Sequence, residues 1–306
     1  MTPRLLDCSA SDLAEFGKTE LLDAIRASEG RTLVCEIAVS TEPVLVSVSN
    51  AELVASVSAD IILLNLFDVL APSVEGLPEG TAPGDVIREI KRLTGRAVGI
   101  NLEPTDERYA PVSGDPHRIP PGRTATLENA ERAIALGADM IVLTGNPGAG
   151  VSNEKIAEAL RTISAGVGDR VALAAGRMHA AGVFDGKAAL SVDDIERFAE
   201  AGADILLVPT PGTVPGVTLE MVHGIVAHAR ARGLLSMTTV GTSQEGADEA
   251  TMRRLALAAK MAGADIHHLG DAGYAGAAVP ESILAYSIAM RGRRHTLTRM
   301  ARSVLR

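Results

Sequence analysis

The stretch that decides the fold is Met261-Ala-Gly-Ala-Asp-Ile-His-His-Leu-Gly-Asp-Ala-Gly-Tyr-Ala-Gly276. Its first half, Gly263-Ala264-Asp265, lies between an alanine-rich helical stretch and a short apolar run. A glycine in the left-handed region that ends a helix, followed by the start of a strand, explains this pattern. The pattern recurs at Ser58-Ala59-Asp60, Gly137-Ala138-Asp139 and Gly202-Ala203-Asp204, each time before an apolar run.

These repeats mark every second strand of a predicted sheet. Four further apolar runs with different introductions alternate with them, so that eight strands are expected. The runs are apolar on both faces, as in parallel strands that helices cover on both sides. The predicted strands are Thr32–Ala38, Ile61–Leu64, Ala97–Leu102, Met140–Leu143, Val171–Ala175, Ile205–Val208, Leu234–Thr239 and a run that begins at Ile266.

Amphipathic helical stretches separate the strands, and a further helical segment around Ser9 to Ser28 precedes them. Strict alternation of eight strands with eight helices predicts an α/β fold, a (β/α)₈ TIM barrel, with an open doubly wound sheet as the structural alternative. We expect one domain over 1–306, in which 1–29 is an N-terminal helical segment, 30–291 the barrel and 292–306 a basic C-terminal extension. The predicted helices are Asn50–Val57, Gly84–Thr94, Thr126–Leu136, Ser152–Ala165, Ser191–Ala201, Thr218–Arg232, Asp248–Ala262 and Pro280–Arg291.

Composition narrows the class of protein. The 306 residues are 46% apolar and 22% charged, which is sufficient for a full globular core. No apolar run approaches the roughly 20 residues that span a bilayer, and the N-terminus lacks the apolar centre of a secretory signal, so a cytoplasmic location without membrane attachment is expected. Cys8 and Cys35 have no short spacing and are expected to be free thiols.

The net charge of −9 is unevenly distributed, because Arg291 to Arg306 holds six arginines and no acid. The acidic remainder disfavours nucleic-acid binding. The spacing of Leu297, Met300 and Val304 predicts a terminal helix that packs on its own subunit or on a neighbouring one. The expected partners are a small anionic metabolite and further copies of the chain in a homo-oligomer.

Polar residues gather where the predicted strands end, which is where TIM barrels carry their chemistry. Alternation along the strands turns Glu36, Asn101 and Glu103 toward the barrel axis, and Arg177 follows the fifth strand. Alternation allows only one of His267 and His268 to face the axis; His268 is the catalytic candidate, and the sequence leaves open which of the two faces the barrel mouth. These carboxylates either act as an acid/base pair or hold a divalent cation, Mg²⁺ or Mn²⁺, or else they are barrel-interior groups satisfied by neighbouring amides or an arginine.

A second group of candidates follows the last two strands. Gly241 and Thr242 follow the seventh strand, and Gly270, Asp271 and Gly273 follow the eighth. These two loops form a phosphate site in many barrels, because their backbone N–H groups converge there. The prediction is a seat for the anionic group of a substrate; the alternative is that the glycines only turn the chain.

Two other loops are candidates. The loop from Pro104 to Thr124 holds Arg108, His117, Arg118 and Arg123, so it is either a lid that brings positive charge over an anionic substrate or a surface excursion. The Gly-rich loop 145–152 matches neither a P-loop nor a dinucleotide fingerprint, and remains a possible backbone cradle. No lysine ends a predicted strand, which disfavours Schiff-base chemistry.

With the repeated Gly-Ala-Asp entries and the glycines after strands seven and eight, the chain resembles the phosphate-binding (β/α)₈ barrels. It looks most similar to a barrel group labelled phosphonomutase-like or haloacid dehalogenase-like. The resemblance implies a preference for phosphorylated ligands. The phosphonomutase and isocitrate lyase group uses a metal held by acidic residues at strand ends, and Glu36, Asp68 and Glu103 match that part, although the group's active-site cysteine motif is absent. In the run Ile61–Leu70, Asp68 resembles a dehalogenase-type nucleophile, but Leu70 stands where that motif has its acid/base residue.

The leading hypothesis is therefore a barrel enzyme that acts on a small phosphorylated or carboxylated metabolite, by lyase or isomerase chemistry. Glu36 or Glu103 would move a proton, one of the two histidines would assist, and a divalent cation would stabilise developing negative charge. The alternatives are a flavin barrel that holds FMN in the same seat, a hydrolase of the dehalogenase-like type, and a non-catalytic barrel that only binds a metabolite.

Overall fold

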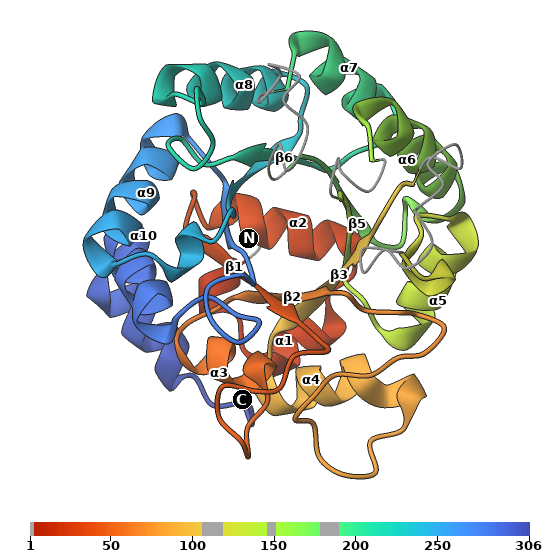
Figure 1. Ribbon diagram of the computed structural model, residues 1–306, viewed down its shortest axis with the longest axis vertical. Helices are drawn as coiled ribbons and strands as arrows, with labels where there is room; N and C mark the ends of the chain where they lie inside the picture. Colours follow the sequence, from red (N-terminus) through yellow and green to blue (C-terminus); the bar gives the residue numbers. More distant parts are fainter. Residues whose placement is uncertain (1–2, 106–118, 146–150, 178–189) are drawn as a thin grey trace.

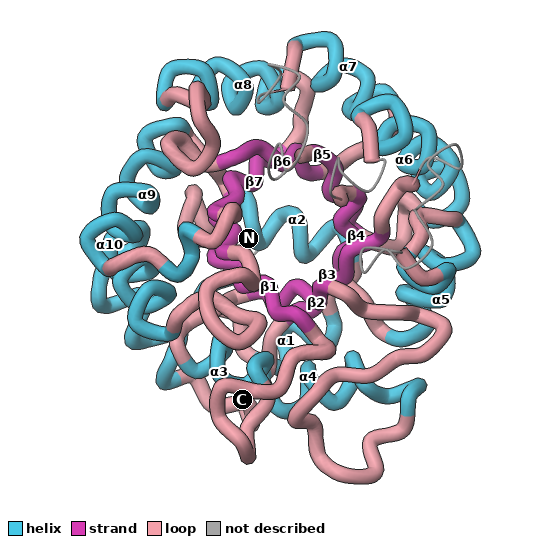
Figure 2. Tube along the Cα trace, in the orientation of Figure 1, coloured by secondary structure: helices cyan, strands magenta, loops and turns pink. Residues whose placement is uncertain are grey.

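The computed structural model describes residues 3–105, 119–145, 151–177 and 190–306. Eight parallel strands pair in chain order and close into a barrel, with β8 hydrogen-bonded to β1 (Figures 1 and 2). The predicted TIM barrel is thereby confirmed, and the open sheet is excluded. The strands are β1 (Thr32–Ala38), β2 (Ile61–Asn65), β3 (Ala97–Leu102), β4 (Met140–Leu143), β5 (Ala172–Gly176), β6 (Ile205–Pro209), β7 (Leu235–Val240) and β8 (Ile266–Leu269).

Helices follow the strands and form the outer ring of Figure 1, and two short ones, α1 (Ala10–Glu15) and α2 (Lys18–Ala27), precede the barrel. No helix in the described part of the chain has the length and apolar content needed to cross a bilayer. The ring consists of α3 (Asn50–Ser56), α4 (Val86–Thr94), α5 (Leu127–Leu136), α6 (Asn153–Val167), α7 (Val192–Glu200), α8 (Leu219–Ala231), α9 (Glu249–Ala262) and α10 (Pro280–Ala301).

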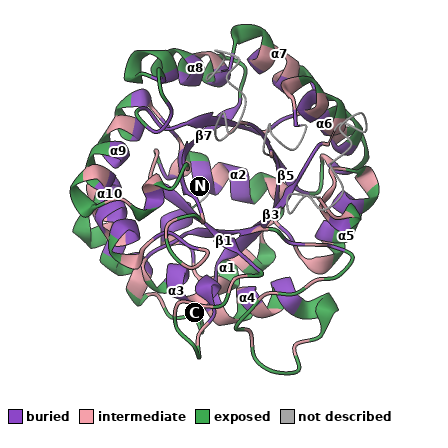
Figure 3. Cartoon of the chain, in the orientation of Figure 1, coloured by how far each residue is buried: buried purple, intermediate pink, exposed green. Residues whose placement is uncertain are grey.

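The strand residues are buried (Figure 3). Alternation divides their side chains between two cores. Leu33, Cys35 and Ile37 of β1 pack outward in the large cluster between strands and helices. Val34 belongs to a second cluster inside the barrel. Because helices cover one face and the barrel interior the other, each strand has to be apolar throughout, as the sequence pattern indicated.

The base of the barrel, at the amino ends of the strands, is closed by the N-terminal segment. Leu21, Leu22 and Ile25 of α2 are buried in the same cluster as the inward residues Ile61 and Leu235, which begin β2 and β7. Figure 2 shows α2 crossing the ring of strands. Access to the interior is therefore left to the opposite rim, where the strands end.

The repeated aspartates connect neighbouring strands at this base. Asp60, which directly precedes β2, accepts a hydrogen bond from the Leu33 N–H of β1 at 2.8 Å. The other three repeats do the same, and every pair joins an even-numbered strand to the odd-numbered strand before it. The remaining pairs are Val98 N–H with Asp139 and Leu173 N–H with Asp204, both at 2.8 Å, and Ser236 N–H with Asp265 at 2.9 Å.

Each of these carboxylates also has a cationic partner. Lys91 pairs with Asp139 at 2.7 Å and Lys18 with Asp204 at 2.8 Å. The backbone turns as predicted, because Gly137, Gly202, Gly263 and also Ser58 have positive φ angles. The sequence indicated the Gly-Ala-Asp motif only as the end of a helix and the start of a strand. Its aspartate also connects two neighbouring strands through a side-chain hydrogen bond.

The basic C-terminal extension packs on its own subunit, but through different residues from those predicted. The helix α10 breaks at Gly292, and Leu297 and Val304 are exposed. The buried side chains are polar: Arg299 and Arg291 pair with Asp60 at 2.9 and 2.5 Å, and all three are cut off from solvent. The apolar spacing was therefore a wrong guide, because a buried carboxylate at the barrel base binds the arginine face of this helix.

We expect the substitution Asp60→Asn to destabilise the protein by roughly 3–5 kcal/mol, because it leaves two buried guanidinium groups without a counter-charge. Urea unfolding followed by circular dichroism measures this loss. The matched control is Asp85→Asn, which removes an exposed ion pair with Arg88 and should change stability by at most about 0.5 kcal/mol. A similar small effect for both variants would contradict the role of Asp60.

Candidate active site

Four polar side chains form a hydrogen-bonded network at the carboxyl rim of the barrel. Asn101, at the end of β3, donates through Nδ2 to Glu36 Oε1 of β1 at 2.6 Å and to Asn65 Oδ1 of β2 at 3.3 Å. Asn65 in turn donates to Asp271 Oδ2 at 2.8 Å. Residues from three neighbouring strands and the loop after β8 are thereby held in one group.

His268 completes this group from β8. Its Nε2 lies 3.5 Å from Glu36 Oε2, and its side chain is buried. The other histidine faces outward, as alternation requires: His267 Nδ1 lies 3.0 Å from the Tyr286 hydroxyl and Nε2 lies 3.2 Å from the Gly30 carbonyl. Burial lowers the pKa of His267 to about 3, so this ring is neutral and structural. Of the two histidines, His268 is therefore the candidate for a catalytic role.

Glu103 lies at the same rim but has a charged partner. Its side chain forms an ion pair with Arg123, and its backbone carbonyl accepts from the Ala125 N–H at 2.9 Å. Burial raises the pKa of Glu103, the Arg123 charge opposes that rise, and the Glu36 carboxylate adds to it. Glu103 thus fastens the chain around Arg123 to β3 and is less available for proton transfer than Glu36.

Asp271, which the sequence analysis placed in a predicted anion seat, has its side chain in the carboxylate network, where it accepts from Asn65. Burial, reinforced by the negative charge of Glu36, raises the pKa of Asp271 to about 7, while the hydrogen bond from Asn65 opposes the shift. A carboxyl group with such a pKa exchanges protons near neutral pH, which is the property of a general acid or base.

Glu245 is a buried carboxylate of the site that the sequence interpretation missed. It lies in the short 3-10 helix η5 (Gln244–Gly246) after β7, and its Oε1 accepts a hydrogen bond from the Ala272 N–H at 3.0 Å. A Cβ atom on Gly270 would lie only 2.8 Å from this oxygen. Since Gly270 continues the inward side of β8 after His268, the carboxylate lies inside the barrel mouth.

This carboxylate stands where the sequence predicted a seat for an anion, and two N–H groups of these loops already have acceptors within the protein. The N–H of Ala272 is used by Glu245, and the N–H of Gly270 donates to the Val240 carbonyl at 2.9 Å. A Cβ atom on Gly273 would lie 2.8 Å from the Ala277 carbonyl, so this glycine serves a close backbone contact. Near Gly241, the Thr242 hydroxyl donates to the Thr213 carbonyl at 3.1 Å. The glycines pack the two loops together, and the negative charge among them belongs to the protein.

A signal for Glu245 was present, but it was not decisive. The glutamate stands five residues after β7 ends, in a loop already marked as functional. Only the fold shows that its side chain is 1% exposed and turned toward β8. A glutamate in a polar loop is by default a solvated residue, which is why the sequence gave it no role.

The predicted metal ligands Glu36, Asp68 and Glu103 are not brought together as a binding group. Within the described ranges, no three His, Cys, Asp or Glu side chains are placed to hold a metal ion. Asp68 lies beyond the end of β2, where its Oδ1 accepts from the Leu70 N–H at 2.8 Å, and it packs against Gly122. Asp68 therefore shapes a loop, and its place gives no support to the dehalogenase-like reading.

The remaining candidate residues are Arg177 and those of the predicted lid and the Gly-rich loop, and only some of them lie in the described part of the chain. Arg177 directly follows β5, at the carboxyl rim, and is half-buried. Arg108, His117, Arg118 and the centre of the Gly-rich loop 145–152 lie outside the described residues. Of the four basic residues in the predicted lid, only Arg123 lies among the described residues, in the ion pair with Glu103.

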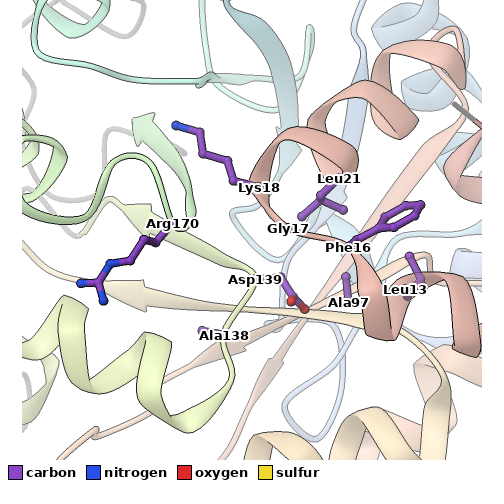
Figure 4. Close-up of a pocket in the computed structure, with 9 residues that line it drawn as sticks. All are labelled: Leu13, Phe16, Gly17, Lys18, Leu21, Ala97, Ala138, Asp139 and Arg170. Carbon is purple, nitrogen blue, oxygen red and sulfur yellow. The ribbon is translucent and has the colours of Figure 1, made fainter.

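A small pocket exists at the other end of the barrel, but it has a different character. Figure 4 shows it at the barrel base, with Phe16, Lys18 and Leu21 of the N-terminal segment beside Ala97 and Asp139. Its volume is about 40 Å³, enough for little more than a water molecule. Lys18 and Asp139 are both held in ion pairs there, so this pocket is a packing gap beside the strand connections described above.

Solved structures with the same fold include two enzymes. The carboxyl transferase domain from Rhizobium etli pyruvate carboxylase, solved with 3-bromopyruvate, is 13% identical at a TM-score of 0.54; the alignment covers 95% of this chain and 51%, about half, of that one. A 2,3-dimethylmalate lyase, a PEP mutase/isocitrate lyase superfamily member, is 11% identical at a TM-score of 0.51, covering 88% of this chain and 82% of that one. At such identities the likeness is one of fold.

Sequence comparison gives the family but no activity. No curated protein matches the chain. A family model described as a domain of unknown function matches residues 6–306, nearly the whole length. The chain therefore belongs to the family Domain of unknown function (DUF7916).

Proposed function

We propose that this protein is a lyase or isomerase that moves a proton on a small carboxylated metabolite at the carboxyl rim of the barrel. The observation that carries the proposal is the network from Asp271 through Asn65 and Asn101 to Glu36, with His268 beside it. Buried carboxylates held by amides next to an imidazole are a means of general acid/base catalysis rather than of barrel filling.

The network gives Glu36 and His268 distinct roles. Asn101 fixes one oxygen of Glu36, and the other oxygen faces His268 at 3.5 Å. Glu36 takes the proton from the substrate carbon, and the His268 imidazole donates a hydrogen bond to the oxygen on which negative charge develops. Asp271, whose pKa is about 7, supplies or accepts the second proton. Asn65 and Asn101 are positioning residues.

The proposed substrate binds its carboxylate at Arg177 rather than at the glycines. Arg177 follows β5, across the closed ring from β1, and a guanidinium group recognises a carboxylate or a phosphate in a bidentate manner. The glycine loops after β7 and β8 do not favour a phosphate, because the Glu245 carboxylate is there already. The lyase among the structures of the same fold supports the reaction class.

The alternatives have less support. A flavin barrel depended on the same glycine seat for the FMN phosphate, and Glu245 opposes an anion there. A hydrolase of the dehalogenase-like type depended on Asp68, which lies in a loop against Gly122. A non-catalytic barrel that only binds a metabolite does not explain several buried carboxylates gathered at the neighbouring ends of β7, β8 and β1. Assembly as a homo-oligomer stays a prediction.

A divalent cation, Mg²⁺ or Mn²⁺, would have to be held by Glu36 together with oxygens of the substrate. The described side chains offer no three-ligand group, and proteins bind Mg²⁺ through as few as one or two carboxylates plus substrate oxygens. We assign no step of the reaction to the metal.

We accordingly expect the protein without substrate to bind Mn²⁺ only weakly, with a dissociation constant of about a millimolar or more. Titration followed by the electron paramagnetic resonance signal of free Mn²⁺ measures this. Tight stoichiometric binding that Glu36→Gln abolishes would restore a protein-held metal site.

Glu36→Gln should lower the rate of proton exchange on the substrate by about 10²- to 10⁴-fold, because the amide cannot accept the proton. The measurement is loss of a C–H proton signal in D₂O, by nuclear magnetic resonance, across a panel of small carboxylic acids. Glu75→Gln, at an exposed loop position, is the matched control and should retain the wild-type rate. A wild-type rate in both variants would show that Glu36 is not the base.

The pH dependence of kcat/KM should follow the protonation of the Asp271 carboxyl group. If its carboxyl group donates a proton, kcat/KM falls as the pH rises through about 7, because the acid form is lost above its pKa. The variant Asp271→Asn should be slower and should lack this decline.

The raised pKa of Asp271 also means that the folded state loses stability as the pH rises from about 4 to 7, since it then binds more protons than the unfolded chain. Asp271→Asn should remove this part of the pH dependence in urea unfolding.

A further inference from the structure

Two buried oxygen atoms in the barrel mouth have no hydrogen-bond partner among the described residues. One is Oε2 of Glu245, whose Oε1 accepts from Ala272 N–H. The other is Oδ1 of Asn101, whose Nδ2 donates to Glu36 and to Asn65, so that the orientation of the amide is fixed by its network. Both residues are more than nine-tenths buried. Each such oxygen carries a desolvation cost until a donor reaches it.

Both of these oxygens are acceptors; the ring nitrogens of His268, which also lack a hydrogen-bond partner, add one donor and one acceptor when the ring is neutral, so acceptors outnumber donors among the unmatched atoms. A carboxylate or phosphate group of a ligand brings further acceptors and further negative charge. A protonated primary amine brings three donors and one positive charge. The chemistry of the unmatched atoms thus calls for a cationic donor.

The charge of the mouth leads to the same conclusion. Glu36, Asp271 and Glu245 lie near enough to influence one another: the charges of Glu36 and Glu245 both raise the pKa of Asp271. Burial also raises the pKa of Glu245 itself. A cation between these carboxylates would relieve their repulsion, whereas an anion would increase it.

We propose that the part of the mouth beneath the ends of β7 and β8 binds a protonated primary amine, with Glu245 as its ionic partner. The inference rests on the proposed function for the place of the site and deepens it: the substrate carries an ammonium group at Glu245 and its carboxylate at Arg177. Glu245 thereby acts as a specificity-determining residue that excludes phosphate from a position where many barrels bind it.

The test is direct binding of three probes: ethylammonium, its neutral isostere ethanol, and inorganic phosphate. The readouts are the nuclear magnetic resonance signals of the Ala272 amide, which donates to Glu245, and of the His268 ring. We expect saturable shifts with ethylammonium, with a dissociation constant on the order of millimolar, and none with the other two probes. Saturable phosphate binding at these signals, or no response to ethylammonium, would overturn the proposal.

Substitutions at Glu245 test whether ethylammonium binds at this residue. Glu245→Gln should weaken ethylammonium binding at least about tenfold, because it removes the charge and keeps the shape. Glu245→Asp should retain binding, and Glu281→Gln, an exposed carboxylate at the start of α10, should leave the affinity unchanged. Equal affinity of wild type and Glu245→Gln would refute the assignment. If the glutamine variant does not fold, the comparison of the three probes on the wild-type protein still decides.

The outcome is independent of turnover. A protein that binds ethylammonium through Glu245 but exchanges no substrate proton would refute the proposed function and support this inference. A protein that exchanges a proton in a Glu36-dependent manner without binding the ammonium would do the reverse.

Discussion

The structure depends on one interaction that occurs four times: an aspartate directly before an even-numbered strand accepts a hydrogen bond from the N–H of the second residue of the preceding strand. Asp60, Asp139, Asp204 and Asp265 make these bonds at 2.8 to 2.9 Å. Each carboxylate is paired with a lysine or an arginine, so the charge is neutralised where burial would otherwise make it costly. Strands are thereby fixed in register two by two at the base of the barrel.

The strand register that is fixed at the base of the barrel also determines which side chains meet at the carboxyl rim. Since the register between strands is set, with Glu36 paired to Leu63 and Ala38 paired to Asn65, the side chains of Glu36, Asn65 and Asn101 reach one another at the rim. The network at the rim is therefore a consequence of pairing at the base. The same division is usual for barrels, in which one end carries stability and the other function.

The candidate site differs from the expected one mainly in its electrostatics. The sequence predicted positive potential from glycine N–H groups after β7 and β8, but Glu245 takes the Ala272 N–H for itself. The loops after β7 and β8 therefore hold a buried carboxylate as well as glycine N–H groups. The fold alone does not decide which ligand such a rim binds.

The sequence alone determined the barrel, because apolar runs of strand length and helix-ending glycines are local properties of the chain. It also determined which side of β1 and β3 faces the axis, since alternation depends only on spacing; Glu36 and Asn101 follow from that. For β8, only the structure decided between His267 and His268. The tertiary structure alone determined the partners of these residues. Whether Glu103 is free or held by Arg123, whether Asp68 reaches the rim, and which buried carboxylate lies over Gly270 depend on contacts between segments distant in the chain, and no local pattern encodes those contacts.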